Sequence, residues 1–337
     1  MRRTASLTAL LTTTALALGP MVGPARAEDT TARQAVSTVT VRLGTLPTGS
    51  HARTTYLIGR DLHLADGTVR HLPFTKAQAR DLVLAGRAGG GWVIGGPAMP
   101  SRDFVLVKGK KKTVVHRGFS DDDTDSWRLS REGTRLLVSY LDRGDDTEFF
   151  VNRLDGTRVV YKYVPGPSRM LEFAAGTVTF SVGAKTKQWS KAEGMSTLTR
   201  RPSALADQPH DLLFVRGDHA GEFGPTTLTA PDTPTWTASF LPVALSPDGT
   251  LVAGYQRKGG WTTHRIDVRR VSDGERIASY QPGISATLRW EDDGALLWTD
   301  YLRGWTSKHA LVRCTIGKKC QRVTSLVKSR PFGFPSP

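Results

Sequence analysis

The stretch Val243-Ala-Leu-Ser-Pro-Asp-Gly-Thr-Leu-Val-Ala253 decides the fold. Apolar residues stand on both sides of a central Asp248-Gly249 turn, and such a turn closes a β-hairpin because glycine adopts positive φ without steric cost. Two segments repeat this arrangement: Trp127-Arg-Leu-Ser-Arg-Glu-Gly-Thr-Arg-Leu-Leu-Val138 and Leu288-Arg-Trp-Glu-Asp-Asp-Gly-Ala-Leu-Leu-Trp298. The chain is therefore expected to contain repeated β-hairpins.

Turns of this kind recur in two interleaved series with a common period of roughly 40–45 residues. One series is centred on Gly67, Gly109, Gly156, Gly194, Asp232, Gly274 and Gly317, and the other on Gly90, Gly133, Gly176, Pro209, Gly249 and Gly294. Two series with one period indicate four strands per repeat, which is typical of a β-propeller blade. We predict an all-β fold, a single β-propeller over residues 36–330 with seven four-stranded blades, or alternatively six.

The three repeats carry a resemblance to a known family. Val243–Ala253 resembles the "SPDG" signature of WD40-like propeller repeats, as in TolB-type periplasmic propellers, and the segments 127–138 and 288–298 resemble degenerate copies of it. The resemblance implies a ring of blades. We expect Ser37–Leu43 and Val323–Val327 to close that ring together, with a linker at 28–35 and a tail at 331–337.

The first 27 residues have the layout of a secretory signal peptide. Met1-Arg2-Arg3 is basic, Ala5–Leu18 is apolar and uncharged, and Ala25-Arg26-Ala27 is a small-x-small cleavage site. We predict cleavage after Ala27 and a secreted, extracellular protein. The remaining 310 residues carry a formal net charge of +12 and no second apolar stretch long enough to span a membrane.

Cys314 and Cys320 are the two cysteines of the chain, and they flank a Gly-Lys-Lys turn. A cross-strand disulfide is the natural interpretation in an oxidising compartment, and a short loop of this kind contributes about 2 kcal/mol in the chain-entropy model. A redox-active pair is the alternative, although the spacing is not C-x-x-C.

Three predicted loops between the second and third strands of a blade pair one tryptophan with two basic side chains. Such loops suit an acidic or hydroxyl-rich polymer, because tryptophan stacks on flat surfaces and lysine and arginine bind anions. The alternative is that each tryptophan packs in the core beside ordinary surface charges. The candidate binding residues are Lys185, Lys187 and Trp189, then Arg257, Lys258 and Trp261, and then Arg303, Trp305 and Lys308.

Aspartates cluster in two loops that are expected to lie on the same face. Calcium is bound by several carboxylate oxygens, so a structural calcium ion is one interpretation, and a solvated acidic loop pair is the other. The candidate ligands are Asp121, Asp123, Asp125, Asp142, Asp145 and Asp146. A second polar group, His210-Asp211 with Asp218-His219, is more readily a polar turn than a metal site, because a metal needs three or four converging ligands.

Composition and motifs limit the function. The composition, with 39% hydrophobic and 23% charged residues, is that of a globular protein. It excludes a disordered chain, a collagen-like chain and a helical membrane protein. It has no G-x-S-x-G, H-E-x-x-H or P-loop motif. We expect a non-catalytic, monomeric binding scaffold without a cofactor, whose partner is a protein or an acidic or glycan polymer rather than nucleic acid. The alternatives are an extracellular propeller enzyme of glycoside hydrolase or lyase type, and a calcium-stabilised structural propeller.

Overall fold

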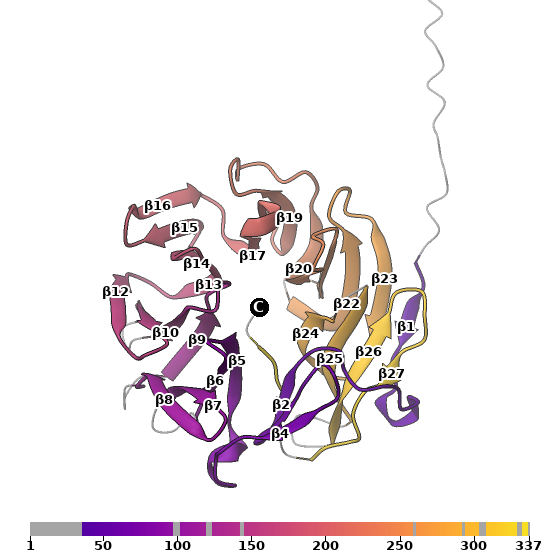
Figure 1. The fold of residues 1–337 in the computed structure, drawn as a ribbon. Helices are drawn as coiled ribbons and strands as arrows, with labels where there is room; N and C mark the ends of the chain where they lie inside the picture. Colours follow the sequence, from indigo (N-terminus) through magenta and orange to yellow (C-terminus); the bar gives the residue numbers. More distant parts are fainter. Residues whose placement is uncertain are drawn as a thin grey trace, which may run out of the picture. The chain divides into compact units, whose positions relative to one another are not determined.

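Six β-sheets surround a common centre in the computed structural model (Figure 1). The structure describes residues 36–96, 102–118, 123–141, 145–258, 261–291, 294–302, 308–328 and 332–335, with backbone only at 123–125 and 286. These residues belong to one compact unit, Val36–Pro337. The all-β propeller prediction is confirmed.

Five of the sheets are four-stranded blades, each built as an antiparallel meander. From the inner to the outer strand they comprise β28 (Phe332–Gly333), β2 (Tyr56–Ile58), β3 (Asp61–His63) and β4 (Val69–His71); β5 (Val83–Ala88), β6 (Gly91–Gly95), β7 (Phe104–Lys108) and β8 (Lys111–His116); β9 (Asp123–Leu129), β10 (Arg135–Leu141), β11 (Thr147–Arg153) and β12 (Arg158–Val164); β13 (Ser168–Ala174), β14 (Thr177–Val182), β15 (Lys185–Ser190) and β16 (Gly194–Thr199); and β24 (Ser285–Trp290), β25 (Ala295–Tyr301), β26 (His309–Thr315) and β27 (Gln321–Arg322).

The sixth sheet has eight strands, so the prediction of seven or six separate four-stranded blades is wrong. Its strands are β17 (Ser203–Asp207), β18 (Leu212–Arg216), β19 (Glu222–Thr227), β20 (Ala238–Leu245), β21 (Leu251–Lys258), β22 (Trp261–Arg270), β23 (Arg276–Gln281) and, at its edge, β1 (Thr38–Thr40). The sheet is continuous because Glu222 and Phe223 of β19 pair with Ser239 and Ala238 of β20. This short pairing joins strands that the turn spacing assigns to different blades.

The helical content of the described residues is three short 3₁₀ turns, namely η1 (Leu43–Thr45), η2 (Gln78–Arg80) and η3 (Gln208–His210). None of these described helices has the length and apolar character needed to cross a bilayer.

Most of the core lies between neighbouring sheets. Leu84 and Ile94 of one blade pack against Leu57 and Leu62 of the preceding blade. The same arrangement continues around the ring, and within the eight-stranded sheet Phe214 packs against Phe240. A single blade therefore has little core of its own, and its stability depends on its neighbours.

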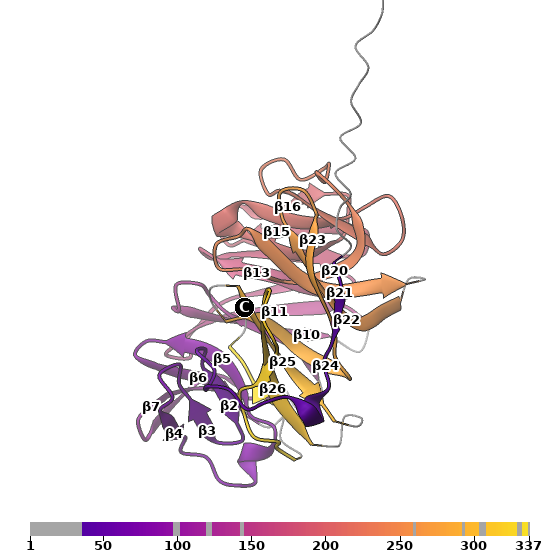
Figure 2. The same cartoon turned by 90° about the vertical axis from the view of Figure 1, so that its right-hand side faces the viewer.

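The two ends of the described chain close the ring in different ways. At the C-terminal end, β28 adds an inner strand to β2, and Phe332 and Phe334 pack with Leu297 and Leu311 of the β24–β27 blade. At the N-terminal end, β1 pairs in parallel with β23 at an outer edge, which both views show (Figures 1 and 2). Residues 323–327 form no strand of a blade, but the Val323 N–H donates to the Leu311 carbonyl and Val327 forms an isolated bridge with His309.

Candidate functional site

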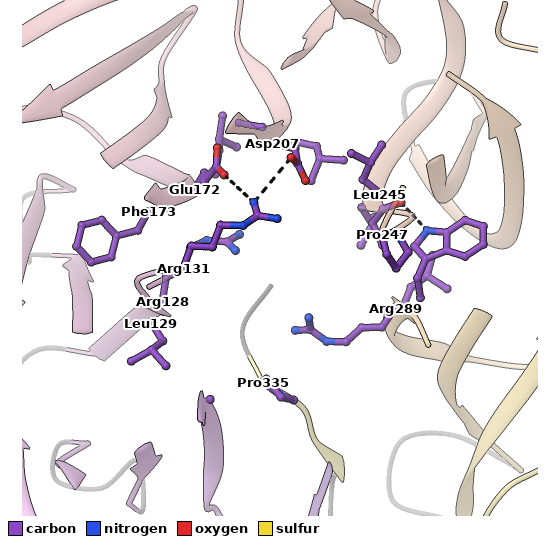
Figure 3. Close-up of a pocket in the computed structure, with 18 of the residues that line it drawn as sticks. Arg128, Leu129, Arg131, Glu172, Phe173, Asp207, Leu245, Pro247, Arg289 and Pro335 are labelled. Atoms are coloured by element: carbon purple, nitrogen blue, oxygen red, sulfur yellow. Dashed lines mark hydrogen bonds and ion pairs between the residues drawn. The ribbon is translucent and has the colours of Figure 1, made fainter. Parts of the chain in front are cut away.

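A cavity of about 650 Å³ opens at the centre of the ring (Figure 3). Its wall is formed by the second half of the inner strands β5, β9, β13, β17, β20 and β24, and by the turns that follow several of them. Pro335, just beyond β28, completes the wall. The volume is within the range of pockets that hold small ligands.

β-Bulges shape this wall. Where the inner strands β5, β13, β17, β20 and β24 pair with their second strands, the register shifts and skips residues such as Leu171, Ala204 and Val243. In β24 the shift skips Thr287 and Leu288, and Thr287 has a φ of 55°, which is rare for a β-branched residue. Bulges turn side chains out of the regular alternation, so the inner strands present a mixed set of residues to the cavity.

The lining combines apolar and charged side chains. Leucines, Phe173, Trp290 and Pro335 supply the apolar area. Four arginines, Arg87, Arg128, Arg131 and Arg289, face two carboxylates, Glu172 and Asp207. With histidine neutral, the described lining therefore carries an excess of positive charge.

At the mouth of the cavity the two carboxylates share one arginine. Arg131 Nη1 lies 3.8 Å from Glu172 Oε1 and 3.9 Å from Asp207 Oδ1, as the dashed lines of Figure 3 show. Both oxygens of Glu172 also accept a hydrogen bond from the Gln208 backbone N–H, while Asp207 Oδ1 is 3.0 Å from His210 Nδ1. Burial raises the pKa of Glu172, and its contact with the Gln208 N–H opposes that rise.

Deeper in the cavity, Arg128 and Arg289 point toward the centre from opposite sides (Figure 3). Burial, together with the smaller effect of the positive charge of Arg128, lowers the pKa of Arg289 to about 9. Burial likewise lowers the pKa of Arg128 to about 10, although Glu172 opposes the shift. Within the part of the chain that the structure describes, Arg289 Nε is buried and makes no hydrogen bond.

Those of the candidate basic and aromatic residues that the structure describes differ in exposure. Trp189 is 5% exposed and packs in the core between two blades, whereas Trp261 is 81% exposed. Lys185, Lys258 and Lys308 are exposed, and Lys187 and Arg257 are half-buried. Arg303 and Trp305 lie outside the described residues.

Trp261 and the cavity wall belong to opposite ends of their sheet. The cavity includes Ser246 and Pro247, in the turn between β20 and β21, whereas Lys258 pairs with Trp261 across the next turn, between β21 and β22. Successive turns of an antiparallel meander lie at alternate ends of the strands. The tryptophan of this hairpin is therefore remote from the residues that enclose the cavity.

Of the candidate calcium ligands whose side chains the structure describes, Asp146 has protein partners. Asp146 accepts hydrogen bonds from the Gly166 N–H and the Tyr163 hydroxyl. Asp145 is exposed and has positive φ. Asp121 and Asp142 lie outside the described residues, as do the side chains of Asp123 and Asp125. No three metal-binding side chains converge within the described ranges.

The cysteines pair as predicted. Cys314 of β26 is bonded to Cys320, just before β27, with their Cα atoms 4.2 Å apart. Both are buried in the core next to the eight-stranded sheet.

The charged residues of the cavity were not predicted, although the sequence contained a signal for Arg128 and Arg289. Arg128 and Arg289 both stand five residues before the turn glycine of their repeats, Gly133 and Gly294. In the copy of the motif at Val243–Ala253 the same position is Ala244, which also lines the cavity. Two repeats therefore have arginine where a third has alanine. This difference in the inner strands was the sequence signal for a charged cavity.

No protein-family model matches the chain, and no curated protein matches its sequence. Solved structures resemble its fold. A chain of the mitotic checkpoint complex has a TM-score of 0.53 at 10% identity, over 74% of this chain and 80% of that chain. The uncharacterized protein lmo1340 from Listeria monocytogenes EGD-e has a TM-score of 0.52 at 10% identity, over 74% and 85%. The AfRom2 CNH domain has a TM-score of 0.53 at 9% identity, over 81% and 99%. At such identities the likeness shows a β-propeller fold and nothing finer.

Proposed function

We propose that this chain is a non-catalytic binding propeller of WD40-like type that works outside the cell, and that its central cavity is the binding site. The observation that carries the proposal is the cavity itself, because side chains from six inner strands meet in one enclosed, mixed apolar and charged space. One of the similar folds belongs to a chain of a multi-protein complex, which agrees with an interaction role. The N-terminal signal pattern supports the extracellular location.

The test is a binding screen of the purified protein against glycans, cell-envelope polymers and secreted proteins, at low and moderate salt and with or without calcium. The variant Arg131→Ala removes a charge at the cavity mouth, and Trp261→Ala removes the exposed ring at the other end of the sheet. Saturable binding that Arg131→Ala weakens and Trp261→Ala leaves unchanged supports the proposal. Binding that only Trp261→Ala weakens overturns the cavity as the site, and binding lost with salt in every variant reflects charge attraction alone.

One observation supports an enzyme as the second candidate. Glu172 and Asp207 each lie within 4.0 Å of the same Arg131 nitrogen, so their carboxylates are at most about 8 Å apart, within the span used by glycoside hydrolases. The raised pKa of Glu172 suits a general acid. Arg131 occupies the space between them, however, and Gln208 engages Glu172. Hydrolysis of a glycan that Glu172→Gln abolishes would establish the enzyme and overturn the non-catalytic proposal.

A further inference from the structure

Three arginines gather around one buried carboxylate on the paired strands β22 and β23. Arg265 and Arg269 stand on β22 on either side of Asp267, each two residues from it, and Arg276 of β23 is the register partner of Arg269. Side chains two residues apart on a strand lie on the same face, as do direct cross-strand partners. The four groups, which we call the arginine cluster, therefore share one face of this hairpin, and none of them lines the central cavity.

Within the described residues, every ion pair of these arginines ends on Asp267. Arg265 Nε lies 3.2 Å from Oδ1 of this carboxylate, whereas Arg269 Nη2 and Arg276 Nη1 lie 3.9 and 4.0 Å from Oδ2. Oδ1 also accepts a hydrogen bond from the Ser279 hydroxyl. One carboxylate thus faces three guanidinium groups, so the arginine cluster carries an excess of two positive charges.

The arginine cluster keeps hydrogen-bond donors that no described residue accepts. The Nε atoms of Arg269 and Arg276 are buried and make no hydrogen bond in the part of the chain that the structure describes. Burial lowers the pKa of Arg269, Asp267 opposes this shift, and the positive charges of Arg276 and Arg265 add to it. The three cations repel one another, and a further anion beside them would relieve that repulsion.

Neighbouring groups hold two of the arginines in position before any ligand arrives. Arg265 Nε donates to Ser279 Oγ at 2.8 Å. Arg269 Nη1 donates to the Gly274 carbonyl at 2.8 Å, and its guanidinium carbon lies 5.6 Å from the centre of the Phe240 ring. A preformed site loses less conformational freedom on binding, which favours affinity.

The arginine cluster is open to solvent, and its carboxylate is not. The side chains of Arg265, Arg269 and Arg276 are 23%, 18% and 30% exposed, whereas that of Asp267 is 1% exposed. An incoming anion therefore meets the arginines and is shielded from the acid. Guanidinium groups donate paired hydrogen bonds to phosphate oxygens, and a phosphate monoester carries about −1.5 to −2 charge at pH 7, which matches the excess charge of the arginine cluster.

We propose that the arginine cluster is a binding site for a phosphate group, either the free ion or an ester carried by a larger molecule. The site is separate from the central cavity and goes beyond the function proposed for that cavity. The excess of two positive charges favours a doubly charged oxyanion over a singly charged carboxylate.

The experiment is calorimetric titration of the purified protein with inorganic phosphate and glucose 6-phosphate, with glucose as the neutral analogue, at about pH 8 so that both anions are doubly charged. We expect saturable binding of at least one anion and none of glucose. Equal affinities would identify the free ion as sufficient, and tighter binding of glucose 6-phosphate would identify an ester. Arg276→Gln should weaken the binding by at least about tenfold, because it removes charge-assisted hydrogen-bond donors.

The matched control is Arg153→Gln, which makes the same change of charge at an exposed arginine of the β9–β12 blade, across the ring from β22 (Figure 1). It should leave the affinity unchanged within about twofold, because distant surface charges are screened. Circular dichroism and thermal unfolding establish that each variant is folded. If Arg276→Gln does not fold, Arg269→Gln gives the same readout from the partner strand.

The inference is overturned if neither anion binds saturably, if glucose binds as well as glucose 6-phosphate, or if the folded variants of the arginine cluster bind like the control. Phosphate binding that Arg131→Ala abolishes and Arg276→Gln leaves intact would place the anion in the central cavity and likewise overturn it. These results are separable from failure of the proposed function, because that function is tested by ligands whose binding depends on Arg131.

Discussion

Arg313 and Glu291 form an ion pair that the surrounding structure removes from water. Arg313 Nε and Nη2 donate to the two carboxylate oxygens at 2.5 and 2.8 Å, and the side chains are 5% and 0% exposed. Arg313 also donates to Ser50 Oγ and to the His51 carbonyl. The pair therefore ties the last blade to the segment that leads into β2.

Replacing Arg313 by methionine should destabilise the protein by about 3–5 kcal/mol, because it leaves the Glu291 carboxylate buried with less compensation. Denaturant unfolding measures the change. The double variant with Glu291→Leu is the control, and it should recover part of the loss because both charges are gone. If the single variant were as stable as the wild type, the pair would contribute nothing.

Asp300 gives the stability a dependence on pH. It is fully buried, its Oδ1 accepts the Tyr301 N–H, and its Oδ2 makes no hydrogen bond to a described residue. Burial raises its pKa to about 6 from an ordinary 3.8. The folded state therefore holds this proton more tightly than the unfolded state, so the contribution to stability is fully present below about pH 4 and is lost as the pH rises through 6.

Asp300→Asn should consequently raise the free energy of unfolding at pH 7 by on the order of 2 kcal/mol, and with it the melting temperature, and give little gain at pH 4. Thermal unfolding of both proteins at each pH measures the difference. The variant and the wild type must be compared at the same pH, because His116 also makes the stability depend on pH. Burial lowers the pKa of His116 to about 4, so the folded state loses stability as the pH falls below about 6.5. An equal gain at both pH values would contradict the assignment.

At the scale of elements, the turns could be predicted and the sheet boundaries could not. Each glycine chosen as a turn centre from the sequence has positive φ, from Gly67 to Gly317. Where the sequence offered Pro209 instead, η3 forms and Asp211 takes the left-handed conformation. Turn chemistry is local and is therefore visible in sequence. The β19–β20 pairing that joins the eight-stranded sheet is a tertiary contact with no local signal.

The segment Phe74–Ala85, which contains no glycine or proline, forms only the short 3₁₀ turn η2. Thr75 and Gln78 cap each other, since the Gln78 N–H donates to Thr75 Oγ1 and the Thr75 N–H to Gln78 Oε1. The helix ends at Arg80, and Val83–Ala88 becomes the inner strand β5, whose Leu84 and Ala85 are buried. Burial in the ring overrides a helical propensity that is worth only tenths of a kcal/mol per residue.

The disulfide closes the β26–β27 connection. Its reduction, or the variant Cys314→Ser with Cys320→Ser, should lower stability by about 2 kcal/mol, because the bond constrains a short loop of the unfolded chain. Thermal unfolding with and without reductant measures this, and the double serine variant should be insensitive to reductant. A much larger loss would mean that the buried sulfurs contribute mainly through packing.

Replacing Phe332 tests how much the inner strand β28 contributes to stability. It is 5% exposed and contacts Tyr56 and His309 through ring edges, so it joins the blade that contains β2 to the last blade. Phe332→Ala should cost about 3–5 kcal/mol in the free energy of unfolding, as for other buried aromatic truncations. Tyr161→Ala, at a ring that is 44% exposed, is the comparison and should cost less. Equal costs would argue against a special role for β28.

At the scale of the whole molecule, the cavity depends on residues from every part of the described ring. Its charged groups could not be assembled from sequence, because Arg128, Asp207 and Arg289 come from three different inner strands. The basic and aromatic loops could be found as a pattern, but whether a tryptophan such as Trp189 faces solvent or a neighbouring blade is decided by packing.

The proposed extracellular location makes a prediction of its own. Protein recovered from the culture medium should begin at Glu28, because the small-x-small site ends at Ala27. N-terminal sequencing or intact mass measures this. A variant with Ala25→Arg and Ala27→Arg should retain the leader, and secreted material that begins at Met1 would reject the signal peptide.

The position of β28 has a consequence for the order in which the molecule is made. A ribosome delivers the chain from its N-terminus, so β2 emerges well before Phe332 and Gly333 and keeps an unpaired inner edge until those two residues are made. Blades with local turns can form as they emerge, yet the ring has no way to close before then. Until these two residues are made, the nascent ring is an open arc, and the inner edge of β2 is exposed to pairing with other chains.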